Sequence, residues 1–247
     1  DVTVEDADAD VTATGGKAGV YSYGIRAYEG SVTISGDTVK ATGGEAGDDS
    51  CGICADHGSV NISGGTVETT GGEAGGSSYG IYGTYNTFLG EGGKTGVTIT
   101  GGNVTATGGT VSSDEAVSCG IYGSSGGVPT GISISGGTVT ATGGEVTDGA
   151  KSYGLCGSSL NAGVSISGGT VTAWGGTQAV GGNTGNIGNN YRINPAATVA
   201  KVEVMAGNDG SDASEVTDED GYENLKNKYL KITITLPEHE VYVGGVG

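Results

Sequence analysis

The chain has 247 residues, of which 54 are glycine, with 28 acidic against 10 basic side chains and a formal net charge of −18. This charge argues against nucleic acid and anionic lipid surfaces as partners, because neutralising phosphates requires clustered lysine and arginine. No apolar run approaches the ~20 residues of a membrane-spanning helix, so no membrane insertion is expected.

The glycines follow a period, which argues against a disordered glycine-rich chain. A partial repeat at residues 11–16 is followed by five full copies of one block, and in each copy the first residue lies 11 positions before the first glycine of a closing Gly-Gly pair. The full copies occupy residues 32–44, 60–72, 97–109, 132–144 and 164–176.

Each block predicts two strands joined by a corner. In the first full copy Val32 and Ile34, and then Val39 and Ala41, alternate with polar residues, which is the period of a strand with one buried face. Most copies place Gly-Gly at the corner, and Asp37, a residue type that tolerates positive φ, replaces the second glycine once. A short segment of the form Tyr/Cys-Gly-Ile/Leu precedes each full block and supplies a third strand.

Three strands and three corners in a unit of 28 to 37 residues predict one rung of a right-handed parallel β-helix. One rung cannot bury its own Val, Ile and Ala, whereas rungs stacked ~4.8 Å apart can. We therefore expect an all-β fold of about six rungs over residues 1–197, with three strands in each rung.

The composition changes after Pro195. Residues 201–205 and 228–237 predict two strands without glycine corners, separated by an acidic loop. An open solenoid end must be covered, so residues 198–247 are predicted to form a capping β segment. Residues 241–245 read like the start of a further module.

The block at residues 134–144, preceded by Gly-Ile-Tyr at 120–122, resembles glycine-rich parallel β-helix repeats of surface proteins of Firmicutes, especially gut clostridia. It is also similar to a clostridial family of polysaccharide-binding β-helix proteins. The resemblance implies an extracellular location, secreted or cell-wall attached, a polysaccharide or cell-surface glycan as partner, and calcium between rungs. The acidic residue that the family places before Gly-Ile is a Tyr or Cys here, so calcium stays unassigned and no cofactor is predicted. The start at Asp1, with no Met or signal peptide, favours a trimmed piece of a larger multidomain chain.

The cysteines favour a structural role. Cys51 and Cys119 share one repeat position two rungs apart, ~10 Å by strand spacing, too far for a disulfide. Cys54 falls on the opposite face of an ideal strand from Cys51, and Cys119 with Cys156 comes nearest to a possible pair. We expect Cys51 and Cys119 to be small buried side chains that alternate along an interior column with tyrosines.

Charged and threonine columns offer weaker alternatives. Glu45 and Glu73 on adjacent rungs could approach the carboxylate separation of a glycosidase, but their repetition indicates a corner role. Arg26 and Lys40 look isolated, with no basic cluster of the kind a polysaccharide lyase uses. Threonine columns on the second strand suggest ice binding, although Lys40 and Glu68 interrupt them.

Aromatic side chains are the main binding candidates. Tyr82 and Tyr122 share a repeat position on adjacent rungs and are expected to point outward, while Tyr85 and Phe88 belong to the longest insertion, at residues 84–96. Insertions on one face of a solenoid commonly form its binding surface. The sequence therefore predicts a non-catalytic glycan-binding or adhesion module, with a passive stalk as the alternative and a lyase, hydrolase or ice-binding protein less favoured.

Overall fold

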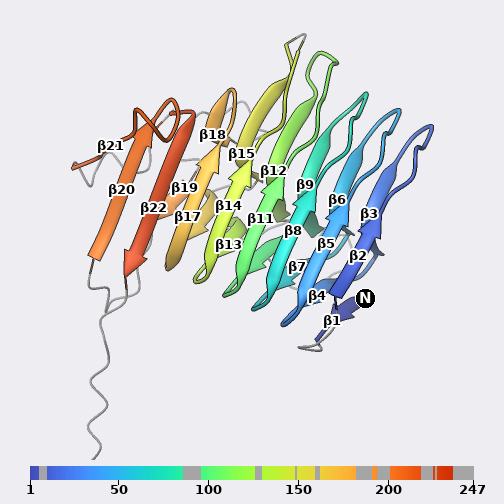
Figure 1. The fold of residues 1–247 in the computed structure, drawn as a ribbon, viewed down its shortest axis with the longest axis horizontal. Helices are drawn as coiled ribbons and strands as arrows, with labels where there is room; N and C mark the ends of the chain where they lie inside the picture. Colours follow the sequence, from blue (N-terminus) through green and yellow to red (C-terminus); the bar gives the residue numbers. More distant parts are fainter. Residues whose placement is uncertain are drawn as a thin grey trace, which may run out of the picture.

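The structure is a computed structural model that describes residues 1–5, 10–85, 96–125, 130–147, 149–158, 162–181, 191–193, 201–217, 225 and 227–235. These residues form an all-β, right-handed parallel β-helix with three sheets and three strands in each rung, as the sequence predicts (Figure 1). Within this part of the chain, no helix is long and apolar enough to cross a membrane.

Each rung contributes one strand to each sheet. The first sheet contains β1 (Val2–Val4), β4 (Val32–Ile34), β7 (Val60–Ile62), β10 (Val97–Ile99), β13 (Thr130–Ile134), β16 (Ala162–Ile166) and β19 (Tyr191–Ile193). The second sheet contains β2 (Asp10–Thr14), β5 (Thr38–Thr42), β8 (Thr66–Thr70), β11 (Asn103–Thr107), β14 (Thr138–Thr142) and β17 (Gly169–Trp174), followed by β22 (Tyr229–Thr235), β20 (Lys201–Gly207) and β21 (Ser214–Glu215). The third sheet contains β3 (Ser22–Tyr28), β6 (Ser50–Asp56), β9 (Ser78–Tyr85), β12 (Val117–Ser125), β15 (Lys151–Ser158) and β18 (Gln178–Gly181).

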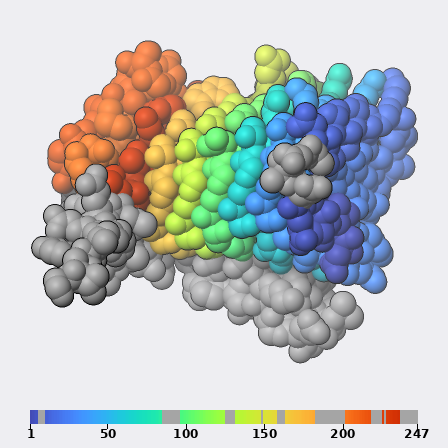
Figure 2. Space-filling model, turned by 60° about the horizontal axis from the view of Figure 1, so that its bottom comes forward, coloured from blue at the N-terminus to red at the C-terminus, as the bar shows by residue number. Residues whose placement is uncertain are grey.

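Equivalent residues of successive copies pair directly. In the first sheet Val97 pairs with Val60 on one side and with Ile132 on the other, and all the strand pairs from β1 to β19 run parallel. Figure 2 shows the rungs as successive bands from blue at the N-terminal end to orange at the C-terminal strands. Residues at the same repeat position therefore form columns along the axis of the β-helix.

The interior is a continuous apolar core. Val32 and Ile34 of the first strand, Val39 and Ala41 of the second and Ile53 of the third are buried, and their apolar equivalents on later rungs belong to the same cluster. Burying a Val or Ile side chain contributes about 1.5–3 kcal/mol. Stacking the rungs is what removes these side chains from water.

The corner between the first two strands requires a left-handed backbone. Gly65 has φ 78°, and Asp37, which takes its place one rung earlier, has φ 69°. Glycine adopts this region without strain, and Asp is one of the few other residues that tolerate it. The prediction made for Asp37 is confirmed.

A column of buried serines, which the sequence analysis missed, links the rungs at the start of the third strand. The Ser50 hydroxyl donates to the Gly44 carbonyl at 2.7 Å and accepts from the Gly72 amide of the next rung at 2.9 Å. A serine stands directly before every Tyr/Cys-Gly-Ile/Leu segment, and all of them are buried: Ser22, Ser50, Ser78, Ser118 and Ser152.

The C-terminal strands extend the second sheet. β22 lies antiparallel beside β17, with Trp174 opposite Tyr229, and β20 lies antiparallel beside β22 (Figure 1). Val204 and Ile232 join the hydrophobic cluster of the β-helix. Both predicted strands are therefore present, while the predicted boundary at residues 197 and 198 and the segment 241–245 lie outside the described residues.

Candidate functional site

The strands of the third sheet depart from regular in–out alternation, and this departure determines which side chains lie on the outer face of the sheet. In β3, Ile25 belongs to the interior core, and a Cβ on Gly24 would meet the backbone of Thr42 on the interior side. Tyr23 and Arg26, which flank this pair, both line a groove on the outside. Two consecutive residues thus face inward, and the residues at either side of them share the outer face.

This departure from alternation corrects the prediction for the cysteines. Cys51 and Cys54 lie on the same outer face, where both line the groove, rather than on opposite faces, and the Cys51 thiol donates a hydrogen bond to the Ile53 carbonyl at 2.9 Å. The predicted alternation along the column is correct, because Cys51 pairs with Tyr23 on one side and with Tyr79 on the other. The prediction that Cys51 and Cys119 are buried is also correct, but they lie outside the interior cluster, because the Gly-Ile pair takes the inward places.

Two columns result on this face. One reads Tyr23, Cys51, Tyr79, Cys119 and Tyr153, and the other reads Arg26, Cys54, Tyr82, Tyr122 and Cys156. Cys119 and Cys156 lie in one buried cluster with Tyr153. All four cysteines are free thiols.

An open groove of about 290 Å³ lies over β3, β6 and β9. Residues of three successive rungs contribute to it, which gives it aromatic walls with a few charged groups. It is lined by Tyr21, Tyr23, Arg26, Tyr28, Asp49, Cys51, Cys54, Asp56, His57, Tyr79, Tyr82 and Thr84.

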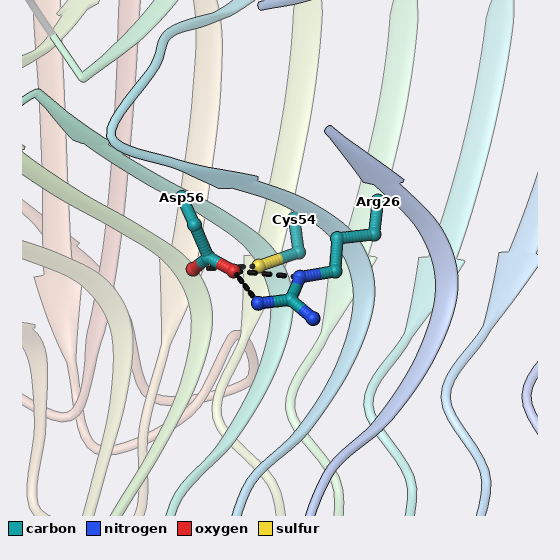
Figure 3. Close-up of polar contacts among 3 residues, drawn as sticks. All are labelled: Arg26, Cys54 and Asp56. Carbon is teal, nitrogen blue, oxygen red and sulfur yellow. Dashed lines mark hydrogen bonds and ion pairs between the residues drawn. The ribbon is translucent and has the colours of Figure 1, made fainter. Parts of the chain in front are cut away.

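An ion pair between two of the lining residues joins two rungs (Figure 3). Arg26 donates from Nε to Oδ2 of Asp56 at 2.7 Å, and its Nη2 lies 2.6 Å from the same oxygen. The Cys54 thiol donates to Oδ1 of Asp56 at 3.3 Å. Burial opposes the charge of Arg26, but the hydrogen bond and the negative charge of Asp56 outweigh it and raise the Arg26 pKa. Arg26 is thus paired with an acidic residue of the next rung, and no other Lys or Arg is among the described residues that line the groove.

The same guanidinium lies between two tyrosines. Its Cζ is 4.4 Å from the centroid of Tyr23 and 5.3 Å from that of Tyr28, distances typical of cation–π contacts. His57 packs edge-on against Tyr28 with the ring centroids 5.9 Å apart. Tyr28 nevertheless stays 63% exposed and Tyr21 stays 49% exposed, so their rings remain accessible from solvent.

The predicted aromatic residues occupy the adjoining part of this face. Tyr82 and Tyr122 pair in register and stack with centroids 5.2 Å apart and an interplanar angle of 12°. Tyr79 packs tilted against both, at 4.9 and 5.3 Å. Tyr82 also lines the groove. Tyr85 ends β9, but its side chain lies outside the described residues, as does the whole of Phe88.

Asp49 supplies a second carboxylate at the edge of the groove. Its Oδ1 accepts a hydrogen bond of 2.7 Å from the Ser77 amide of the next rung. Burial raises the Asp49 pKa against the effect of this hydrogen bond, and the negative charges of Asp48 and Asp56 raise it further. The charges around Asp49 therefore make this part of the groove electronegative.

The thiols are poorly suited to nucleophilic chemistry. The neighbouring Cys51 side chain, together with burial, raises the pKa of Cys54, and burial raises that of Cys119. A thiolate is the reactive form, and both effects disfavour it. Within the described part of the chain, no three His, Cys, Asp or Glu side chains are placed to hold a metal ion.

The other predicted columns lie away from the groove. Glu45 and Glu73 are exposed, and Glu45 pairs with Lys17 at 2.5 Å. Lys40 and Glu68 form the expected pair between neighbouring rungs on the second sheet, at 3.2 Å. Both ion pairs are solvent-exposed, so they contribute little to stability.

The sequence analysis missed most of the groove. Tyr21, Tyr28 and Asp56 were not predicted as site residues, although the 28-residue offset between the first rungs pairs Tyr28 with Asp56. That offset was the feature of the sequence from which this pairing could have been predicted. The departure that turns both columns outward was not visible in the alternation pattern.

A family model described as a beta helix repeat matches residues 32–53, 60–81, 97–127, 132–154 and 164–191, about half of the chain. Each matched segment runs from the first strand of a rung through the second strand and into the third. No curated protein and no solved structure matches the chain.

Proposed function

The chain belongs to the beta helix repeat family, and from this premise we propose that it is a non-catalytic, extracellular glycan-binding or adhesion module of a bacterial surface protein, secreted or attached to the cell wall. The glycan would lie along the outer face of the third sheet. The observation that carries the proposal is the open groove with aromatic walls that three rungs form there.

The groove offers the two kinds of contact that a sugar ring needs. A pyranose presents C–H groups on its faces, and these pack on the electron-rich face of an aromatic ring. Tyr21 and Tyr28 present exposed rings for this purpose, and Tyr82 lies further along the same face. Hydroxyl groups around the sugar ring need acceptors, which the carboxylates of Asp49 and Asp56 provide.

The shape favours a chain over a single sugar. Residues of β3, β6 and β9 line the groove, and the Tyr82–Tyr122 stack continues the aromatic surface onto β12. A partner that contacts several rungs gains from each contact while the rigid β-helix loses little entropy on binding. We therefore expect polysaccharides to bind more tightly than monosaccharides.

The test is retention in gels that contain soluble polysaccharides, followed by calorimetry with the polymers that retard the protein. Tyr28→Ala is expected to weaken binding by about tenfold or more, because the exposed ring contributes to ligand contact without supporting the core. Tyr229→Ala is the matched control, since this tyrosine lies on β22 of the second sheet. Failure of every polysaccharide to bind would favour the passive stalk instead.

A further inference from the structure

We propose that the groove selects uncharged polysaccharides and rejects acidic ones, and that the Arg26–Asp56 ion pair sets this selectivity. The inference rests on the proposed glycan-binding function and names its ligand class. It is argued from the charges of the lining residues and from the ion pair that Arg26 forms with Asp56.

The groove holds no unpaired permanent cation among its described lining residues. Arg26 is its one guanidinium, and both Nε and Nη2 contact the Asp56 carboxylate. The same guanidinium also lies over the rings of Tyr23 and Tyr28. Arg26 already shares its positive charge with Asp56, so a uronate would meet a guanidinium that an existing charge-assisted contact largely neutralises.

The remaining charges repel an anion. Asp49 lies in the groove and Asp48 is close enough to influence it, while the whole chain carries a net charge of −18. Partly enclosed sites focus such a field, and like charges oppose binding. Among the described lining residues His57 is the other basic side chain, and its ring packs edge-on against Tyr28.

The same carboxylates suit neutral sugars. An ionised carboxylate only accepts hydrogen bonds, and every free hydroxyl of a neutral hexose can donate one. The Asp49 carboxyl is already held in place by the Ser77 amide, and Asp56 by Arg26. Acceptors that are fixed before the ligand arrives lower the entropic cost of binding.

The experiment compares ligands that differ in charge. At pH 8 and low salt, the full chain is run through gels containing galactomannan, mixed-linkage β-glucan or arabinoxylan, and through gels containing polygalacturonate or alginate. We expect at least one uncharged polymer to retard the protein and the acidic polymers to be bound at least tenfold more weakly. Binding to the uncharged polymer should change little with added salt, since no charge pairing is involved.

A second, more specific part of the experiment uses Asp56→Asn. This substitution keeps the size of the side chain and one oxygen acceptor but removes its negative charge. This variant frees the charge of Arg26, so affinity for polygalacturonate should rise on the order of tenfold and fall again with salt. Glu68→Gln is the matched control, because it removes one negative charge from an inter-rung ion pair on the second sheet. Circular dichroism and thermal unfolding establish that both variants fold.

The outcomes separate the two proposals. If the wild-type protein binds an acidic polymer as tightly as its best uncharged ligand, the selectivity is wrong and the glycan-binding function stands. If Glu68→Gln gains as much polygalacturonate binding as Asp56→Asn, the net charge of the chain and not this ion pair sets the selectivity. If no polymer binds, both proposals are wrong.

Discussion

The Ser78 hydroxyl accepts a hydrogen bond from the Gly109 amide across 2.9 Å, and donates one to the Gly72 carbonyl at 2.8 Å. The hydroxyl thereby links two successive rungs at a fully buried position. The neighbouring glycine is required for this contact, because a Cβ on Gly71 would clash with the Ser78 oxygen. The closing Gly-Gly pair and the serine before the third strand therefore depend on each other, because the glycine leaves the space in which the serine hydroxyl makes its hydrogen bonds.

Ser78→Ala is therefore expected to lower the free energy of unfolding by about 1–3 kcal/mol, because a partly buried amide and a partly buried carbonyl each lose a partner. Chemical denaturation monitored by circular dichroism measures the change. Ser63→Ala, at an exposed corner, is the control and should leave stability within about 0.5 kcal/mol. Equal stability of the two variants would show that the serine column adds nothing.

Thr69→Val is expected to stabilise the protein by about 1 kcal/mol. The Thr69 side chain occupies an interior position that is alanine on both neighbouring rungs, and its hydroxyl has no hydrogen-bond partner among the described residues. Valine keeps the shape and removes a buried polar group whose desolvation is uncompensated. Thr66→Val on the exposed face of the same strand serves as the comparison in the same unfolding assay.

The thiols should resist modification in the folded protein. All four cysteines are buried, and the pKa values of Cys54 and Cys119 lie above the ordinary value. Treatment with a chromogenic disulfide reagent at pH 8 should label few thiols in the native protein and all four after unfolding in guanidinium chloride. Rapid labelling of a native thiol would contradict the structure of this face.

Asp49→Asn should make the protein more stable at neutral pH. Burial raises the pKa of Asp49 in the folded state, so the folded protein holds this proton more tightly than the unfolded chain, and the Asp49 contribution to stability falls as pH rises through that pKa. Asparagine removes the charge and keeps an acceptor for the Ser77 amide. The difference in unfolding free energy should shrink as pH is lowered towards the ordinary Asp value, 3.8.

A difference that grows on acidification would show that the ionised carboxylate is stabilising in the folded state. The Lys17–Glu45 pair provides a comparison, because both partners are exposed on the surface and Glu45→Gln should change stability little at any pH.

The sequence was sufficient for the fold because its corners are local. The constant spacing of 11 residues and the glycines that bound it set strand length and register, so that Val60, Val97 and Ile132 had to lie in one column. The Lys40–Glu68 pair and the Tyr82–Tyr122 stack follow from the same register. Equal spacing on neighbouring rungs determines which residues pair across the sheet, independently of the face on which their side chains lie.

Which way a side chain faces in the third strand was decided by the tertiary structure. Gly24 and its equivalents pack against the backbone of the next rung's second strand, a contact between distant residues, and this packing turns two consecutive residues inward. Cys51 and Cys54 consequently share the outer face, and Arg26 reaches Asp56 across 2.6 Å. Side chains alternate between the two faces only in a regular strand. The local sequence pattern therefore determines which residues form a column, and long-range packing determines the face on which the columns and the groove lie.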